Sequence, residues 1–170
     1  MQNAHSPSVK LCTYQDYTFE TERLLIRPIA ERDRQMYVGL YSDEKTMRNI
    51  KAPLTTQRAE DVFNRVLNAV DKSITSGEPN YLIWTIELKE TGQALGLQAL
   101  VWKPVSLLDT RSNQVVTTKP NEPEIGIMLN RLAQGKQVPY EARKALLHFA
   151  FNHLAINQLY TTFGRKNIPI

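Results

Sequence analysis

The stretch EIGIMLNRLAQGKQVPYEA, residues 124–142, decides the fold. Residues 124–129 form a short apolar run that predicts a strand, and the polar loop at 130–137 contains a glycine. Pro139 suits the first turn of a helix, and apolar side chains then recur at helical spacing. Residues 158–163 read as the next strand. This order of strand, glycine loop, helix and strand predicts an α/β domain.

The start of the predicted helix can bind an anion. Its first backbone N–H groups have no intrahelical acceptor, and the helix dipole favours negative charge there. Gly135 permits a tight backbone, and the amides of Lys136, Gln137 and Val138 could converge on a phosphate, with Lys136 adding charge. The same pattern also occurs in an ordinary strand-to-helix connection. The residues alone therefore leave phosphate binding and a structural role open.

Length and composition limit the number of domains and the class of protein. A chain of 170 residues, 42 % of them hydrophobic, is long enough for one domain with a core. Residues 1–18 mix polar residues without a period and are expected to be a poorly ordered extension, which leaves residues 19–170 as a single domain. No membrane span or secretory signal is evident, so we expect a cytoplasmic protein that does not bind a membrane.

Charge and cysteine content exclude several classes of protein. The net charge is +4, with acids interspersed among the bases, which does not indicate nucleic-acid binding. Cys12 is the only cysteine, so neither an internal disulfide nor a cysteine-based zinc site can form. His148 and His153 are five residues apart on the predicted helix, a poor spacing for a shared metal, and we expect no metal site.

The remaining elements are predicted from periodicity. Residues 23–27 suit a strand near a sheet edge, and two short helices fit between residues 30 and 50. A long amphipathic helix follows Thr55 and Thr56 and ends before Gly77 and Pro79. Residues 81–88 and 94–102 form a predicted hairpin. The stretch 103–123 is too long for a tight connection and is either a flap or an added ribbon.

The chain carries four segments, FETERLLIRP at 19–28 and those at 41–44, 124–127 and 134–142, that together resemble the Rim-like (ribosomal-protein-alanine acetyltransferase) branch of the GNAT superfamily of N-acetyltransferases. Residues 19–28, FETERLLIRP, resemble the opening of these enzymes, whose first strand carries a Thr-Glu-Arg-Leu segment. Residues 41–44 resemble their second short helix, and 124–127 resemble their Glu-Ile-Gly-Tyr strand. Residues 134–142 match their Trp-Gly-Lys-Gly-Tyr-Ala-Thr-Glu-Ala loop. The order and spacing of these segments carry the resemblance, which runs from about residue 19 to residue 167.

The resemblance implies a mixed, mostly antiparallel twisted sheet with helices on both faces, splayed between its fourth and fifth strands. It implies acetyl-CoA as co-substrate, with the pantetheine arm paired to the strand at Met128 and Leu129. Asn167 matches the asparagine that touches the cofactor after the fifth strand. The implied pyrophosphate site comprises Gly135, Lys136, Gln137 and Val138.

The implied reaction is direct attack of a primary amine on the thioester carbonyl, without a covalent intermediate. Glu124 lies where a carboxylate could accept the amine's proton, directly or through water, and is the candidate base. The preferred acceptor is a protein N-terminus, and the alternative is a small-molecule amine. A cationic acceptor needs an acidic cleft, for which the candidates are Glu122, Glu124 and Glu87.

Three departures from the family pattern bear on activity. Gln137 replaces the second glycine of the loop, where a side chain crowds an anion, and Pro139 removes one amide from the helix start. The family also continues past the asparagine with a helix that carries a tyrosine, whereas Ile170 is the last residue here. We therefore expect a C-terminally truncated chain whose apolar edge a partner, as in a homodimer, could cover. A non-catalytic acyl-CoA-binding sensor is the alternative class.

Overall fold

The computed structural model describes residues 12–48, 50–103, 106–109, 114–117, 122–131, 133–134 and 137–162, the two short stretches 106–109 and 114–117 by their backbone alone. The strands are β1 (Phe19–Glu20), β2 (Leu24–Pro28), β3 (Tyr81–Leu88), β4 (Gln93–Val101), β5 (Ser106–Asp109), β6 (Gln114–Thr117) and β7 (Glu124–Leu129). The helices are η1 (Glu31–Asp33), α1 (Arg34–Ser42), α2 (Glu44–Met47), α3 (Thr56–Ser76) and α4 (Val138–His153).

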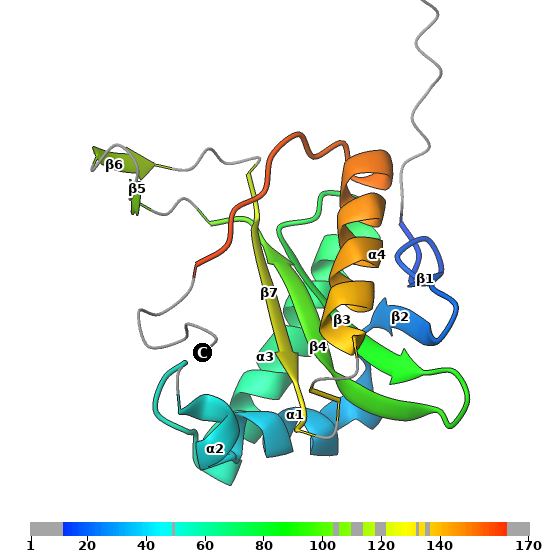
Figure 1. Cartoon of the computed structure of the whole chain (residues 1–170), viewed down its shortest axis with the longest axis vertical. Coiled ribbons are helices and arrows are strands. Elements are labelled where there is room, and N and C mark those ends of the chain that lie inside the picture. The colour runs from blue at the N-terminus through cyan, green and yellow to red at the C-terminus, as the bar shows by residue number, and fades with distance from the viewer. Residues whose placement is uncertain are drawn as a thin grey trace, which may run out of the picture.

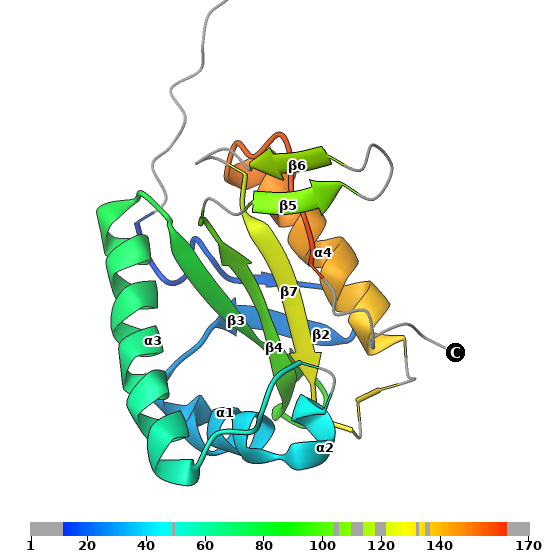
Figure 2. The same ribbon diagram turned by 90° about the vertical axis from the view of Figure 1, so that its left-hand side faces the viewer.

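A five-stranded antiparallel sheet forms the centre of the fold, in the order β1-β2-β3-β4-β7 (Figure 1). The helices α3 and α4 lie on opposite sides of this sheet (Figure 2). Short connections join β1 to β2 and β3 to β4, as is usual for antiparallel neighbours, whereas the helices α1, α2 and α3 lie between β2 and β3 in the chain and β5 and β6 lie between β4 and β7. The predicted mixed α/β fold with helices on both faces is therefore confirmed.

Helix α3 carries a recognisable stop or start signal at each end. The Thr55 side chain accepts a hydrogen bond from the Arg58 N–H at 3.2 Å, which satisfies one of the donors at the helix start. Gly77 ends the helix in the left-handed region at φ 63°, a conformation that glycine adopts without steric penalty. The side chains buried on the inner face are Ala59, Phe63, Val66, Val70, Ser73 and Ile74.

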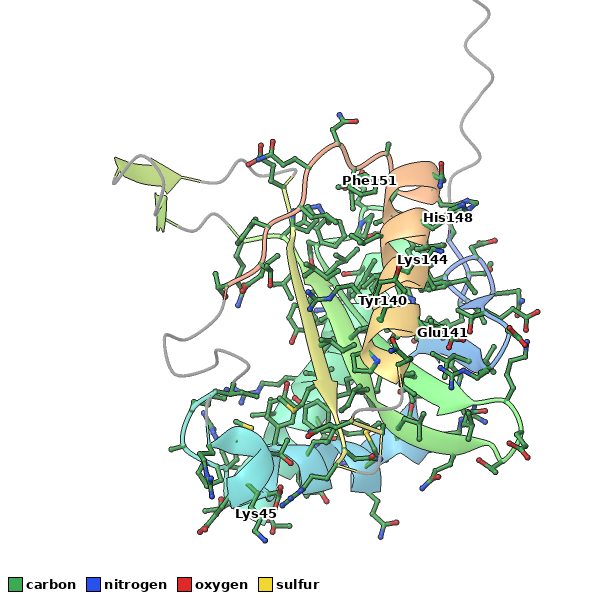
Figure 3. All side chains as sticks on the ribbon, in the orientation of Figure 1. Lys45, Tyr140, Glu141, Lys144, His148 and Phe151 are labelled. Carbon is green, nitrogen blue, oxygen red and sulfur yellow. The ribbon has the colours of Figure 1, made fainter. Side chains whose placement is uncertain are left out.

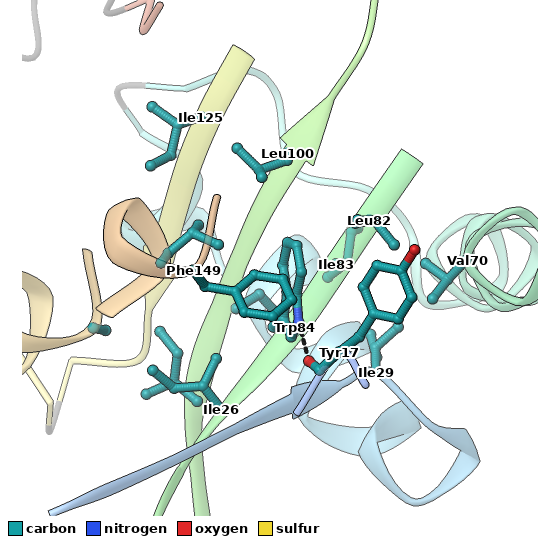
Figure 4. Close-up of a cluster of buried hydrophobic side chains, with 14 of the residues drawn as sticks. Tyr17, Ile26, Ile29, Val70, Leu82, Ile83, Trp84, Leu100, Ile125 and Phe149 are labelled. Atoms are coloured by element: carbon teal, nitrogen blue, oxygen red, sulfur yellow. Dashed lines mark hydrogen bonds between the residues drawn. The ribbon is translucent and has the colours of Figure 1, made fainter. Parts of the chain in front are cut away.

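An aromatic cluster joins helix α4 to the sheet (Figure 4). Phe149 of α4 stacks on Phe19 with ring centroids 4.6 Å apart and meets Trp84 edge-on at 6.0 Å. The indole Nε1–H of Trp84 donates to the Tyr17 carbonyl at 2.7 Å. Tyr17 lies within the range assigned to the N-terminal extension, yet it is 1 % exposed. The packed structure therefore includes residues before Phe19.

The stretch between β4 and β7 contains a two-stranded ribbon. Strands β5 and β6 pair with each other in an antiparallel sheet of their own. Figures 1 and 2 show this ribbon beyond the end of the main sheet, near the start of β7. Of the two alternatives for residues 103–123, the backbone shows the added ribbon.

The strand predicted at 158–163 is wrong in extent. Within the described part of this segment, Tyr160 alone bridges to Glu124, in parallel. A strand needs a neighbour along its length, and this segment departs from β7 after one residue pair, so the ladder cannot continue. Apolar residues alone do not show that divergence.

Buried charges connect β2, β3 and η1. The Arg27 guanidinium contacts Asp33 at 2.8 Å and Glu87 at 2.8 Å, and Thr85 Oγ1 donates to Asp33 at 2.8 Å. Asp33 is 2 % exposed. Burial by itself raises the pKa of Asp33, but hydrogen bonds from Arg27 and the Ala30 N–H, with the Arg27 charge, bring it below its usual value.

We predict that Asp33→Asn lowers the free energy of unfolding at pH 7 by about 3–5 kcal/mol, because it leaves Arg27 buried without its main counter-charge. The depressed pKa contributes stability above the unfolded-state value of about 3.9, and that stability is lost as pH falls through the lower folded-state pKa. Urea unfolding between pH 7 and pH 3 should show a smaller acid loss for the variant. The exposed control Asp61→Asn should follow the unmutated chain.

Candidate active site

Strand β7 has two unlike edges. One edge pairs with β4 from Glu124 to Leu129. The other is bonded at its start, where the Ile125 N–H donates to the Tyr160 carbonyl at 2.8 Å and the Tyr160 N–H donates to the Pro123 carbonyl at 3.2 Å. Beyond this point the two segments diverge within the described residues. The divergence opens a wedge whose vertex lies at Glu124 and Tyr160.

Alternation along β7 identifies the main-chain groups that face this wedge. Ile125 directs its N–H outward to Tyr160, so Ile127 and Leu129 direct theirs to the same outer edge. Gln134 Nε2 donates to the Leu129 carbonyl at 3.2 Å. The Ile127 N–H and C=O have no partner among the described residues. Met128, paired with Leu97, directs its main-chain groups to β4 instead.

A cleft of about 610 Å³ occupies the wedge, and we name it the vertex cleft. Its walls come from β4, β7, the segment after α4, and single residues of α1, β3, α4 and the segment after α2. The residues used below are Tyr41, Gln98, Glu124, Ile127 and Arg143. Thr161 and Thr162 line it from the diverging segment. The vertex cleft therefore combines a carboxylate, a phenol, an amide and a guanidinium.

Glu124, the predicted base, lies at the vertex. Its Oε1 accepts a hydrogen bond from the Thr162 hydroxyl, and its side chain is half-buried. The contact holds the carboxylate against the diverging segment while leaving it in the wall of the cleft. A carboxylate in this position can accept a proton from a group that enters the cleft.

Tyr41 supplies a protonated hydroxyl to the same cleft. Burial raises the pKa of Tyr41, and a hydrogen bond with Tyr37 partly offsets this rise. The two rings stack with centroids 4.5 Å apart, and burial also raises the pKa of the neighbouring Tyr81 to about 12. Tyr41 therefore keeps its proton at neutral pH and is able to donate a hydrogen bond.

A second cleft, of about 570 Å³, lies between α2 and the end of β7, and we name it the basic cleft. Lys45 and Arg48 line it from α2 and its end, and Arg131 and Gln134 from the loop after β7. No ion pair to these three cations occurs in the described part of the chain, although Arg131 lowers the pKa of Asp43 after the larger effect of Thr46. The basic cleft is suited to negative charge.

Helix α4 begins at Val138, so Pro139 is at its second position rather than its first. Gln137 precedes it in the left-handed region at φ 62° and ψ 0°, a conformation that favours glycine. The Gln137 side chain makes no capping hydrogen bond to this helix start. Val138 is buried, whereas Tyr140 is 68 % exposed and lies with Lys144 and His148 on the outward face of α4 (Figure 3).

Glu141 ties this helix start to the turn between β1 and β2. Its Oε1 accepts from the Thr21 hydroxyl at 2.5 Å, and its Oε2 accepts from Arg23 Nε at 2.8 Å. Burial raises the pKa of Glu141, but the hydrogen bonds from Thr21 and Arg23 bring it below its usual value. Two family-like segments therefore meet in space, since Thr21 and Arg23 belong to one and Glu141 to the other. We name this contact the Glu141 clamp.

The structure describes five of the eight predicted site residues. Glu124 lines the vertex cleft, Met128 lines both clefts, and Leu129 lines the basic cleft. Gln137 and Val138 form the start of α4. Gly135, Lys136 and Asn167 lie outside the described residues. The predicted roles of all eight stay predictions.

Sequence reasoning missed several residues that line the vertex cleft. Tyr41 and Gln98 come from elements that precede β7, and only the sheet order brings them beside Glu124. Strict alternation along β7, counted from a known outer contact, would have pointed to Ile127. Arg143 lines the cleft, whereas its neighbour Lys144 faces the other side of α4, beside Phe19 and His148.

Glu87 does not contribute to an acidic cleft, because Arg27 and Arg32 bind its carboxylate. No group of three His, Cys, Asp or Glu side chains suited to a metal ion occurs in the described ranges. His153 instead stacks on Phe149 at 5.2 Å. In the part of the chain described, no helix combines the length and apolarity needed to cross a bilayer.

An antiparallel sheet that opens beside Glu124, with a strand-loop-helix unit next to the opening, places the chain among splayed-sheet α/β proteins. A family model for the acetyltransferase (GNAT) domain matches residues 23–170, and the chain belongs to this family. It is therefore a GNAT-type N-acetyltransferase, and the family's co-substrate is acetyl-CoA.

Solved structures agree with this fold. A GNAT-family acetyltransferase from Bacillus anthracis is similar with a TM-score of 0.67 at 18 % identity, over 88 % of this chain and 75 % of that one. A proposed ribosomal-protein-serine acetyltransferase from Vibrio cholerae has a TM-score of 0.67 at 18 % identity, over 92 % and 79 %. Spermidine N-acetyltransferase from Vibrio cholerae, in complex with CoA and spermine, has a TM-score of 0.64 at 15 % identity, over 86 % of this chain and 75 % of that one. A search of curated proteins finds no match.

Gly96 keeps β7 in place beside β4, and we predict that Gly96→Ala destabilises the protein. A Cβ at Gly96 would overlap the Met128 carbonyl and lie 2.7 Å from the Leu129 Cα, so the end of β7 must shift. Overpacking of this kind costs about 1–3 kcal/mol. Thermal unfolding should show a lower Tm. Gly126→Ala is the control on β7 itself, because its Cβ would meet nothing within 4 Å.

Proposed function

We propose that this chain transfers the acetyl group of acetyl-CoA to a primary amine at a protein N-terminus, and that it belongs to the Rim-like branch. The observation that carries the proposal is the vertex cleft, in which Glu124 lies beside a strand edge that remains open at Ile127. The Glu141 clamp supports the branch assignment, because Thr21, Arg23 and Glu141 all belong to Rim-like segments and contact one another.

The residues of the vertex cleft suit direct transfer. The amine nitrogen attacks the acetyl carbon, the C–N bond forms, and the C–S bond breaks with the electron pair leaving on the CoA sulfur. Glu124 accepts the proton that the amine loses. The Ile127 N–H can donate to the carbonyl oxygen as negative charge develops on it. Tyr41 lines the same cleft in its protonated form and can supply a proton to the leaving thiolate.

The donor's phosphates are assigned to the start of α4. The first amides of this helix lack intrahelical acceptors, and the Gln137 side chain makes no capping hydrogen bond to them. The proposed pyrophosphate site comprises Gly135, Lys136, Gln137 and Val138, with Asn167 contacting the cofactor further along. The pantetheine arm then runs along Ile127, Met128 and Leu129 toward Glu124. The family resemblance supports these assignments.

Charge favours a protein N-terminus over a polyamine as acceptor. The described walls of the two clefts carry Lys45, Arg48, Arg131 and Arg143, against the carboxylate of Glu124. A polyamine carries several positive charges, which these cations repel. A peptide N-terminus brings one positive charge at most, and any acidic side chain beside it would be attracted. Spermine therefore fits this site poorly, although the Vibrio cholerae spermidine acetyltransferase is seen in complex with it.

The function is tested by calorimetry with acetyl-CoA followed by thiol release with a panel of amines. We expect binding, and turnover with a peptide that has a free N-terminus, but little turnover with spermidine. The same peptide with an acetylated N-terminus is the matched control and should release no thiol. Binding without turnover across the panel would identify a sensor instead of an enzyme.

We predict that Glu124→Gln lowers kcat about 100-fold, because the amide cannot accept the proton from the amine. The affinity for acetyl-CoA should change little, since the substitution preserves shape. Steady-state thiol release and calorimetry separate the two effects. Glu90→Gln, on the exposed β3–β4 turn, is the control and should retain full activity. An unchanged kcat in Glu124→Gln would remove Glu124 as the base.

Gln137→Gly should tighten acetyl-CoA binding and raise stability. The left-handed backbone at φ 62° disfavours a residue with a Cβ by about 1 kcal/mol, and glycine also lets the phosphate approach the helix start. Calorimetry should show a lower Kd, and thermal unfolding a higher Tm. If Kd does not fall, the Gln137 side chain does not crowd the phosphate.

A further inference from the structure

The feature that the proposed reaction leaves unexplained is the amide of Gln98. This residue lies in the middle of β4, where it pairs with Trp84 on one side and Ile127 on the other. Directly opposed residues in antiparallel strands point to the same face, so Gln98 faces the apolar side of the sheet that α4 covers. Its side chain is 1 % exposed.

Both polar atoms of this amide lack a partner. Neither Oε1 nor Nε2 of Gln98 makes a hydrogen bond among the described residues, although both are buried. An unsatisfied buried amide is unfavourable, and an aliphatic side chain of similar volume at this position would avoid that penalty. Packing of the free protein therefore gives no reason for a glutamine here.

The position of Gln98 supplies the missing reason. Gln98 is among the residues that line the vertex cleft, together with Glu124 and Ile127, so the cleft is the side from which a ligand could approach its amide. Ser42 offers a contrast, because its hydroxyl is also buried without a partner but lines neither the vertex cleft nor the basic cleft. An unpartnered amide that lines the cleft marks a contact made by a ligand.

The chemistry of the amide restricts that ligand. Nε2 requires an acceptor and Oε1 requires a donor, so a ligand group that offers both satisfies the whole amide. A protonated amine offers donors alone, and a thioester carbonyl offers an acceptor alone. The pantetheine arm of coenzyme A carries two secondary amides, each with one C=O and one N–H. That arm is also the part of the donor assigned to β7 beside Ile127.

We propose that Gln98 is a positioning residue for the donor, whose side-chain amide hydrogen-bonds the secondary amides of the pantetheine arm inside the vertex cleft. This inference rests on the proposed function, because it takes coenzyme A as the ligand of the cleft. Gln98 acts by holding the arm so that the thioester lies beside Glu124. It takes no part in proton transfer.

The test is Gln98→Met, which keeps the volume and removes both polar atoms. Without a ligand, removing an unsatisfied amide should raise Tm by about 2–4 °C. Calorimetry should show Kd rising about tenfold for CoA and for acetyl-CoA alike, because both contain the pantetheine arm. The KM for the peptide acceptor should not change. Ser42→Ala is the matched control, which should raise Tm and leave both Kd values unchanged.

Four results would overturn the proposal. Unchanged Kd values would show that the amide does not touch the donor, and a loss confined to acetyl-CoA would place it against the acetyl group. A change confined to the acceptor's KM would place it against the acceptor peptide. A lower Tm in Gln98→Met and also in Gln98→Leu would show that the amide has partners in the free protein.

The two proposals fail separately. CoA binding that depends on Gln98 without any turnover refutes acetyl transfer by this chain and supports the Gln98 contact. Turnover together with Kd values that are the same for Gln98→Met and the unmutated chain refutes the contact and supports the transferase. If the unmutated chain fails to bind CoA, the Gln98 contact is refuted whatever the variants do.

Discussion

The structure depends on strand β7, which is fully paired on one edge and, within the described residues, meets another segment at a single bridge on the other. β4 holds β7 along its whole length, with Gly96 allowing close approach at its end. Tyr160 holds the opposite edge at Ile125. The N–H and C=O of Ile127, which would bond to a neighbouring strand in a complete sheet, therefore face the wedge. The carboxylate of Glu124 lies at the point where pairing stops.

The rest of the domain keeps that wedge in a defined shape. The aromatic contacts of Phe149 with Phe19 and Trp84 fix α4 on one face of the sheet. The Arg27, Asp33 and Glu87 charges fix η1 against β2 and β3 on the other side. Neither group lines the vertex cleft. Packing contacts that lie away from the wedge leave the residues of its walls available for a ligand.

Periodicity was sufficient to predict most of the fold from the sequence. The amphipathic pattern after Thr55 and the alternation in the β3–β4 hairpin are local signals, and the structure follows both. The strand at 158–163 was over-predicted because divergence from a neighbour leaves no trace in local composition. Tyr17 falls in the stretch predicted to be an extension. No local pattern shows that Trp84, 67 residues further along the chain, donates a hydrogen bond to the Tyr17 carbonyl.

Some residues of the candidate site could likewise be predicted from local sequence, and others could not. Glu124 could be identified because it begins a recognisable strand, whereas Tyr41 and Gln98 reach the cleft only through the order of strands and helices. A glutamine within an apolar strand looks like an ordinary polar interruption until its burial is known. The left-handed backbone at Gln137 likewise follows from the loop's path and not from the residue type.

The Glu141 clamp joins positions separated by 118 residues, Arg23 near one end of the described chain and Glu141 near the other. A ribosome releases these segments in sequence, so the first strand emerges long before its acidic counterpart exists. Until then, the contacts of Thr21 and Arg23 with Glu141 cannot form. The contact between the start of α4 and the β1–β2 turn is consequently completed late in biosynthesis, after the hairpin and the long helix have had time to associate.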